Sequence, residues 1–299
     1  MTISHRSYLL RGGQGPLWLF AFFTSKIYFA LLFCAARSAA WGIKMSEQVQ
    51  LLGMVLSSLP IGEYDKRLVI LTKDRGKISA FAKGARRQNS ALLACSQPFA
   101  FGNFALYEGR TSYNVKSAEI IQYFTELQTD WEAVCYSSYL AEYADYYTRE
   151  NVEAADILKL LYQSLRALAK GTIDKALVRY IYELRMYLCN GEAPEMFSCV
   201  RCHKSQVEEG WEPRLHMKKG GLICPDCLHK LQKQENTEKL PPVVGEAELY
   251  AMRYILTAPL EKLYTFRLSD EAECGFASIM DWYRQVYVPH TFHSLENLF

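Results

Sequence analysis

The sequence has almost no net charge. Its 299 residues include 34 lysines and arginines and 32 aspartates and glutamates, which leaves a formal charge of +2 at pH 7. Five of the basic residues and none of the acidic ones lie in residues 1–45, so residues 46–299 hold 29 basic and 32 acidic side chains, a net charge of −3. A charge of that size does not attract a polyanion to the whole surface. Any binding of nucleic acid must therefore come from a local basic patch.

The sequence also lacks the common catalytic motifs. It has no Walker-type phosphate loop, no Gly-x-Ser-x-Gly elbow and no His-Glu-x-x-His pair. It contains no repeat of fixed period and no low-complexity tract, while half of its residues are hydrophobic and 22% are charged. This composition is typical of a folded protein and excludes collagen-like, disordered and multi-span membrane chains. We expect a protein that is not an enzyme and has no small-molecule substrate.

One long apolar run stands apart from the rest of the sequence. Residues 17–36 match the hydrocarbon core of a bilayer in length, although Lys26 interrupts the run. Three interpretations are open for residues 1–44. Translation starts at Met45 and the extension is a start-site artefact, or the run is a membrane anchor or signal peptide, or the extension is an ordered part of the fold. The pattern of a folded domain begins at Ser46, and the fold prediction starts there.

Residues 45–125 are predicted to form a small closed barrel. Short runs of strand-like residues follow one another here with no long helix between them. The runs cover residues 49–56, 68–72, 77–82, 99–107 and 113–124. Asp74-Arg75-Gly76, between the second and third runs, is typical of a hairpin. Pro60-Ile61-Gly62-Glu63 is predicted to form the turn after the first strand.

Residues 126–299 are predicted to be mainly helical. Apolar residues recur at helical spacing in five segments, which are residues 131–148, 154–169, 173–189, 245–256 and 270–287. Five tyrosines of the first segment, at positions 136, 139, 143, 146 and 147, are expected to pack between helices with their hydroxyl groups at the rim. Residues 238–244 contain Pro241-Pro242 and are predicted to be a linker.

Four of the nine cysteines form two CxxC pairs within residues 197–233. Cys199 and Cys202 make the first pair, and Cys224 and Cys227 make the second after 21 intervening residues. Two thiolates from each tight turn can reach one ion, so two turns complete a tetrahedral four-sulfur site. The pattern predicts a structural zinc ion, because four cysteines leave no coordination position for water. A redox pair at Cys224 and Cys227 is the competing interpretation, but it leaves the first pair unexplained.

The other five cysteines are scattered in mostly apolar surroundings. Free thiols together with a metal cluster indicate a reducing compartment, hence the cytoplasm.

A basic patch is predicted on the barrel. Residues 46–124 hold ten basic and six acidic side chains, an excess that the acidic remainder of the chain lacks. The residues expected to contact DNA are Lys66, Arg67, Arg75, Lys77, Lys83, Arg86 and Arg87. Tyr64, Phe81 and Tyr107 are available for stacking on bases. The alternative is an ordinary solvated hairpin surface, and composition alone leaves both interpretations open.

Several of these segments resemble the RecO family of bacterial recombination mediators. The similarity is carried by Gly62-Glu63-Tyr64-Asp65-Lys66-Arg67, by Leu71-Thr72 and Gly76-Lys77-Ile78, by Ala82-Lys83-Gly84-Ala85-Arg86-Arg87 with Ser90, and by Gln97-Pro98-Phe99. It extends over residues 45–299 and includes the two CxxC pairs and the terminal His290-x-Phe292-x-Ser294-Leu295 segment. The N-terminal extension departs from the family pattern.

The resemblance implies an α+β protein with an N-terminal OB-fold β-barrel, residues 45–125, and a helical domain, residues 126–299, that carries the zinc module. RecO-like proteins bind single- and double-stranded DNA, anneal complementary strands and assist the loading of RecA on DNA coated with the single-stranded-DNA-binding protein. Their partners are RecR and the single-stranded-DNA-binding protein, and in some pathways RecF. A cytoplasmic, nucleoid-associated DNA repair protein with a structural Zn²⁺ is therefore expected. The alternative function is a membrane-anchored zinc-ribbon adaptor with residues 17–36 inserted.

Overall fold

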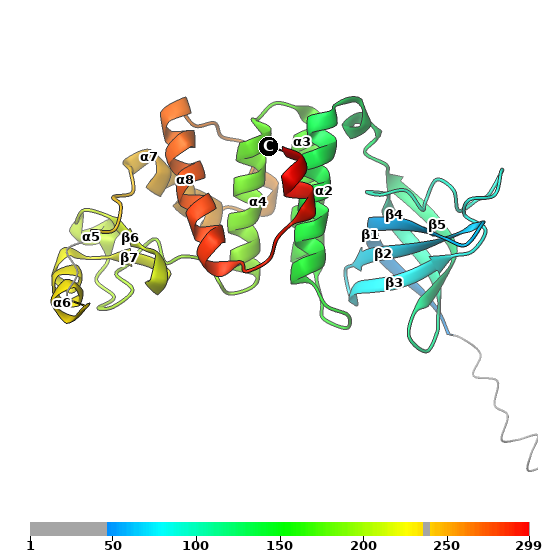
Figure 1. The fold of residues 1–299 in the computed structure, drawn as a ribbon, viewed down its shortest axis with the longest axis horizontal. Coiled ribbons are helices and arrows are strands. Elements are labelled where there is room, and N and C mark those ends of the chain that lie inside the picture. Colours follow the sequence, from blue (N-terminus) through cyan, green and yellow to red (C-terminus); the bar gives the residue numbers. More distant parts are fainter. Residues whose placement is uncertain (1–46, 236–239, 299) are drawn as a thin grey trace, which may run out of the picture. The chain divides into compact units, whose positions relative to one another are not determined.

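The computed structural model describes residues 47–235 and 240–298. Residues 1–46 lie outside the described residues, and so do the three interpretations of residues 1–44. Figure 1 shows a β-barrel, a group of long helices, and a small module that contains the second sheet. The three parts follow one another along the chain, except that the module is inserted between helices.

Five strands form the closed barrel, in the order β1-β2-β3-β5-β4. They are β1 (Gln48–Ile61), β2 (Asp65–Thr72), β3 (Gly76–Ala82), β4 (Phe101–Glu108) and β5 (Tyr113–Gln122). Every neighbouring pair is antiparallel except β3 and β5, which pair in parallel at Ala80 with Tyr113 and at Phe81 with Asn114. A closed five-stranded barrel of this kind is the OB fold, so the predicted fold of this part is confirmed.

Alternation of buried and partly exposed residues accounts for the strands. In β3 every second residue from Gly76 to Ala82 is buried, which gives one inward and one outward face. The inward side chains of β3 meet those of β4, among them Phe104 and Leu106, in a core that belongs to the barrel alone. The hydrophobic pattern therefore fixes which face of each strand is presented to solvent.

Strand β1 is longer than the sequence predicts. Pro60 and Ile61, expected in a turn, continue the strand and pair with Lys66 and Asp65. The fixed φ angle of proline is compatible with an extended strand where its missing N–H is not needed. Only at Gly62, with a φ of +56°, does the chain turn into β2.

The five predicted helices are confirmed to within two residues at either end. They are α2 (Trp131–Tyr147), α3 (Ala155–Lys170), α4 (Lys175–Cys189), α7 (Glu246–Thr257) and α8 (Asp270–Tyr287). Short 3-10 turns, η1 (Thr125–Thr129), η3 (Leu260–Lys262) and η4 (His293–Leu298), connect or end them. The ends are fixed by local chemistry, since Asp130, Asp174 and Ser269 accept hydrogen bonds from the first-turn N–H groups of α2, α4 and α8.

The tyrosines of α2 pack between helices as expected, but two hydroxyl groups do not reach the rim. Tyr139 and Tyr143 are fully buried, and the Tyr139 hydroxyl donates to Glu183 Oε1 at 2.5 Å. Glu183 of α4 holds the Tyr139 hydroxyl inside, and the terminal segment covers Tyr143, because η4 packs along α2 and Phe292 stacks on the Tyr143 ring at 4.8 Å. Tyr146 remains 37% exposed.

The barrel and the helices share one hydrophobic cluster. Met54, Leu56 and Leu71 of the barrel belong to the same group of buried side chains as Phe124 and Leu127 and the residues of α2, α3 and α4. The barrel and the helices are therefore packed against each other through a shared hydrophobic core.

Residues 148–154, between α2 and α3, form backbone hydrogen bonds with the β2–β3 turn. The Lys77 N–H donates to the Arg149 carbonyl at 3.2 Å, and the Ala154 N–H donates to the Lys73 carbonyl at 2.9 Å. Gly76 pairs with Glu150 as an antiparallel bridge. We call residues 148–154 the clasp. The clasp therefore covers Gly76 and pairs with the beginning of β3, while Lys73 and Asp74 at the tip of the turn remain exposed.

The module comprises α5 (Gln206–Glu209), β6 (Arg214–His216), η2 (Met217–Lys219), β7 (Gly221–Ile223) and α6 (Pro225–Glu235). The linker predicted at residues 238–244 is partly wrong, although residues 236–239 lie outside the described residues. The Leu215 N–H donates to the Pro242 carbonyl, and the Val244 N–H donates to the Pro213 carbonyl at 2.8 Å. The chain after the prolines therefore runs along β6, since an extended proline segment still offers carbonyl acceptors.

Candidate nucleic-acid interface and metal centre

The seven basic residues predicted to contact DNA fall at opposite ends of the β2–β3 hairpin. Lys66 pairs with Ala82 at one end, and Thr72 pairs with Gly76 at the other. Six residues of extended strand separate the two ends, a distance of about 20 Å. Five of the seven lie at the first end, where β1 turns into β2, and the other two lie beside the clasp. The expectation of one continuous patch is therefore corrected.

Arg75 and Lys77, the two residues beside the clasp, are neutralised within the molecule. Arg75 Nη1 donates to Glu108 Oε2 at 2.7 Å and to the Tyr113 hydroxyl at 2.9 Å, and the hydrogen bonds to Tyr113 and Glu108 raise the pKa of the guanidinium. Lys77 Nζ donates to the Asp145 carbonyl at 2.6 Å and lies 3.1 Å from Asp145 Oδ1. These two cations hold the barrel together and fasten it to α2.

The other five basic residues share the end of the barrel where β1 turns into β2. We call this group, Lys66, Arg67, Lys83, Arg86 and Arg87, the basic end. None of the five forms an ion pair with any carboxylate of the described residues. The pKa of Lys66 is lowered by burial and by the positive charge of Arg86. Neighbouring cations that form no ion pair with a carboxylate favour the binding of an anion.

The loop that carries three of these cations is anchored on the β1–β2 turn. The Gly84 N–H donates to Asp65 Oδ1 at 2.7 Å, and the Arg86 N–H donates to the Tyr64 carbonyl at 2.8 Å. The Arg87 guanidinium lies 5.1 Å from the centre of the Tyr64 ring, which is 43% exposed. Residues 83–87 are thus positioned by the strands and do not form a loose basic loop.

An aromatic row continues from the basic end across the barrel surface. Arg67 pairs with Phe81, Phe81 with Asn114, and Asn114 with Tyr107, on β2, β3, β5 and β4 in turn. Residues directly opposite one another in a sheet point to the same face. All four side chains are at least partly accessible to solvent. We call these four residues the aromatic row, after its two aromatic side chains, Phe81 and Tyr107. Asn114 is a member that the sequence alone does not indicate.

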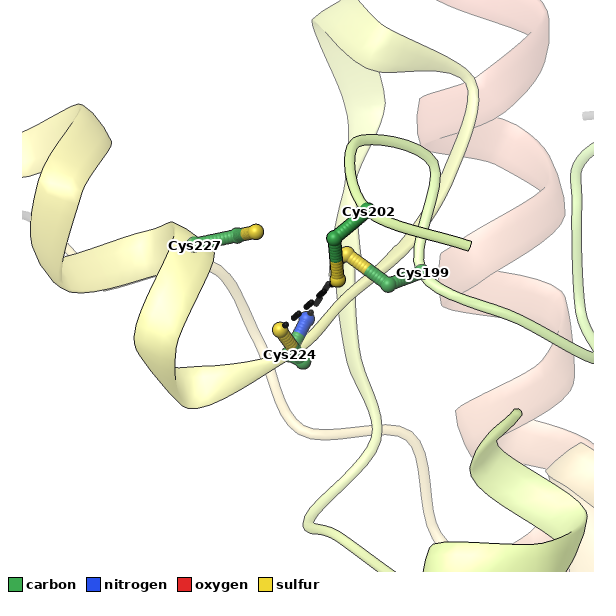
Figure 2. A group of neighbouring side chains, drawn as sticks. All are labelled: Cys199, Cys202, Cys224 and Cys227. Atoms are coloured by element: carbon green, nitrogen blue, oxygen red, sulfur yellow. Dashed lines mark hydrogen bonds between the residues drawn. The ribbon is translucent and has the colours of Figure 1, made fainter. Parts of the chain in front are cut away.

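The four cysteines of the module come together as predicted. Their sulfur atoms all lie within 4.8 Å of one another, and the sulfurs of Cys202 and Cys224 are 3.6 Å apart. Figure 2 shows Cys199 and Cys202 on a loop that faces Cys224 and the beginning of α6, which carries Cys227. A tetrahedral zinc ion with bonds of 2.3 Å would place sulfur pairs about 3.8 Å apart. The four side chains can therefore hold a metal ion.

The pKa values of three of these thiols are shifted in different directions. Burial alone would raise the pKa of the Cys199 thiol, but hydrogen bonds from the N–H groups of Cys224, Cys202 and Arg201 outweigh it and lower the pKa to about 7. Burial raises the pKa of Cys224 and raises that of Cys227 to about 12. A divalent cation would hold all four as thiolates.

Several residues outside the CxxC pairs hold the module together. Glu195 Oε1 accepts from the N–H groups of Phe197 and Ser198 just before the first cysteine. Arg253 of α7 reaches into the module, where its Nε donates to the Met196 carbonyl at 2.8 Å and its Nη2 to Gln206 Oε1 at 2.7 Å. Sequence reasoning missed both residues, because nothing in the local pattern distinguishes them from other charges on a helix or loop.

Comparison with known proteins identifies the family, over a range that includes the barrel and the four cysteines. Two family models match the chain, "Recombination protein O N terminal" over residues 45–124 and "Recombination protein O C terminal" over residues 128–296. The DNA repair protein RecO of Alkaliphilus metalliredigens is 31% identical over 245 residues, which cover 82% of this chain and 96% of that protein. The chain belongs to the RecO family.

Further members of the RecO family give the same result. The DNA repair protein RecO of Caldicellulosiruptor bescii is 35% identical over 184 residues, 62% of this chain and 72% of that protein. That of Bacillus subtilis is 29% identical over 237 residues, 79% of this chain and 88% of that protein. The resemblance found in the sequence is thus confirmed, and neither RecO family model describes a catalytic domain.

The membrane-anchored alternative gains no support from the RecO relatives. Its anchor, residues 17–36, lies outside the described residues. Within residues 47–235 and 240–298, no helix has both the length and the apolar composition required to cross a bilayer.

Proposed function

We propose that this RecO-family protein binds single- and double-stranded DNA with its barrel and acts in DNA repair and homologous recombination. The observation that supports this most directly is the basic end, five cations without a carboxylate partner in the described residues, which continues into the aromatic row. The face of strands 2 and 3 with the adjoining loops is also where OB folds bind oligonucleotides.

The chemistry of binding follows from the two surfaces. Lys66, Arg67, Lys83, Arg86 and Arg87 neutralise phosphates and release the counterions condensed on the DNA. Unpaired bases of a single strand stack on Tyr64, Phe81 and Tyr107. Duplex DNA offers its phosphates but not its base faces, so it uses the basic end alone. No covalent step is involved.

Membership of the family supports a wider role. We propose that the protein anneals complementary strands and, with RecR, assists the loading of RecA on DNA coated with the single-stranded-DNA-binding protein, with RecF as a further partner in some pathways. It acts in the cytoplasm at the nucleoid. We also propose a domain boundary near residue 125, between the DNA-binding barrel and the helical part, where η1 begins.

We propose that the metal of the four-cysteine site is zinc and that its role is structural. Four thiolate donors in a tetrahedral arrangement suit zinc, and their sulfur separations fit it. When bound, zinc cross-links the loop of Cys199 and Cys202 to the beginning of α6.

A salt series tests the DNA-binding proposal. The barrel variant combines Lys83→Gln, Arg86→Gln and Arg87→Gln, and a control variant combines Arg166→Gln, Lys170→Gln and Lys262→Gln, which removes the same charge from exposed helical positions. Affinity for a fluorescent single-stranded oligonucleotide is measured from 50 to 300 mM salt. In the barrel variant we expect an affinity loss of about tenfold or more at low salt and a log–log slope shallower by about 2, since each phosphate contact on a single strand contributes about 0.7. Equal behaviour of the barrel and control variants would refute the proposal.

A further inference from the structure

The zinc module carries an excess of positive charge of its own. Residues 197–233 contain seven basic and four acidic side chains, although residues 46–299 as a whole are net acidic. These charges are not part of the basic end or the aromatic row, because the described residues of the module pack on helices α7 and α8 and not on the barrel.

Most of the acidic charge in the module is used internally. Lys204 Nζ lies 3.8 Å from Glu209 and 3.5 Å from Asp226, and Arg214 lies 2.7 Å from Glu212. Within the module, the cations that form no ion pair with the described residues are Arg201, Lys218, Lys219, Lys230 and Lys233. The positive excess of the module is therefore not cancelled by its own carboxylates.

Two of these cations lie on one face of α6, and a third lies beside it. The helix buries Cys227, Leu228 and Leu231 against the small core beside the cysteines, so its opposite side is exposed. Lys230 and Lys233 lie on that exposed side, three residues apart and hence neighbours on the helix surface.

Arg201 joins them from the first CxxC turn. Its Nη2 donates to Gln234 Oε1 at 3.2 Å, and Gln234 lies one turn beyond Lys230 on the same side of the helix. We call Arg201, Lys230 and Lys233 the cationic face of α6.

We propose that the cationic face of α6 is a second DNA-binding surface, which contacts the phosphate backbone independently of the barrel. This rests on the proposed function, since it assigns a further contact to the same ligand. A chain with two such surfaces can contact two DNA segments at once.

The side chains around the cationic face favour a phosphate backbone over an acidic protein. The other exposed residues of α6 are Pro225, Asp226, His229 and Gln234, and the Asp226 carboxylate lies 3.5 Å from Lys204 Nζ. Specific binding of a protein segment normally depends on a buried aromatic or aliphatic anchor, which this side of α6 does not offer. A phosphate backbone needs only correctly spaced cations.

The test uses the full chain with its metal. The module variant combines Arg201→Gln, Lys230→Gln and Lys233→Gln, and it is compared with the barrel and control variants in the same salt series. We expect the slope for the module variant to become shallower by about 2, with an affinity loss of about tenfold at low salt, and the control variant to match the wild type. All three substitutions are at exposed positions, and thermal unfolding with measured zinc content verifies that the module remains intact.

The outcomes separate the two proposals. If only the barrel variant loses affinity, the module surface is not a DNA site while the proposed function stands. If neither variant differs from the control, the proposed function itself fails. Loss of zinc from the module variant would show that the three cations serve to balance the 2− charge of a tetrathiolate centre, and it would overturn the second site. Unchanged DNA binding combined with lost binding of an oligoglutamate peptide would assign the surface to acidic proteins instead.

Discussion

Arg179 is a buried cation at the centre of the helical part. Its side chain is 1% exposed, its Nε donates to Glu183 Oε1 at 2.7 Å, and its Nη2 donates to Asp281 Oδ1 at 2.9 Å. The same Glu183 oxygen also accepts from Tyr139. Because Glu183 is completely buried, its charge depends on the arginine for compensation.

We expect Arg179→Met to lower the free energy of unfolding by about 3 to 5 kcal/mol, since it leaves the Glu183 charge buried without its partner. Urea denaturation measures the loss. Lys159→Met is the matched control, because it breaks the exposed ion pair with Glu261 and should cost less than about 1 kcal/mol. Similar losses of unfolding free energy in both variants would mean that the buried ion pair stabilises the fold no more than an exposed one.

Glu142 is a second residue whose charge stabilises the fold. Burial alone would raise its pKa, but hydrogen bonds from Ser294 and from the His293 N–H outweigh it and lower the pKa below the ordinary value of 4.5. The folded state therefore favours the carboxylate. This contribution is complete above the unfolded-state pKa and is lost as the pH falls through the folded-state pKa.

Glu142→Gln should accordingly destabilise the protein by about 1 to 2 kcal/mol at pH 7. The difference from the wild type should shrink as the pH falls from about 5 to 3, where the wild-type carboxylate becomes protonated as well. Thermal unfolding at several pH values tests this, with the exposed Glu126→Gln as a control. A difference that does not change with pH would contradict the assigned role of the charge.

At the scale of elements, the clasp and the β2–β3 turn fit too closely for any side chain at Gly76. This glycine has a φ of +61°, and a Cβ atom on it would lie 2.1 Å from the Arg149 carbonyl oxygen and 2.4 Å from that of Val152. Gly171 has nearly the same φ, +59°, but open space around its Cβ position. Comparing substitutions at Gly76 and Gly171 therefore distinguishes the cost of backbone strain from the cost of a steric clash.

We expect Gly171→Ala to cost about 1 kcal/mol, the usual cost of a left-handed conformation for alanine, and Gly76→Ala to cost about 3 kcal/mol or more. Chemical denaturation of both variants measures the difference. Equal costs would show that the clasp moves away readily from the turn.

The helices were predictable because their apolar residues recur at helical spacing, and α2, α3, α4 and α8 also have a local signal at one end. Asp130, Asp174 and Ser269 cap α2, α4 and α8, and Gly171 ends α3 in the left-handed conformation. The two CxxC pairs were predictable for the same reason, since spacing alone brings each pair to one turn. Information of this kind is contained within a few neighbouring residues.

Features that depend on distant partners were not predictable. Lys77 reads as a surface cation on a hairpin, but its partner Asp145 lies 68 residues later in the sequence. Pro242 reads as part of a linker, but it pairs with Leu215 of β6. The division of the basic patch into a basic end and two neutralised cations therefore required the tertiary structure.

At the scale of the whole molecule, we expect the proposed metal and the fold to be coupled only in part. Leu215 of β6 and Leu222 of β7 belong to the main helical core, whereas α6 packs through Leu228 and Leu231 on the small cluster beside the cysteines. Loss of the metal should therefore affect the two parts of the module differently.

We expect a chelator to remove hydrogen-exchange protection from residues 197–206 and 224–235 while β6, β7, the barrel and the long helices keep theirs. Exchange measured by mass spectrometry with and without chelator tests this, and added zinc should restore the protection. Loss of protection throughout the chain would show that the metal is required for the entire fold.

The clasp has a consequence for how the protein is made. Only Ala80 and Phe81 of β3 pair with β5, and the beginning of β3 is instead paired with Arg149 and Glu150. On a ribosome the five strands emerge before α2 and the clasp, so the nascent barrel carries a strand edge with unpaired backbone groups. Such an edge is a template for pairing with a neighbouring chain. Protection against aggregation is therefore complete only when the segment after α2 has been synthesised and has paired with the beginning of β3.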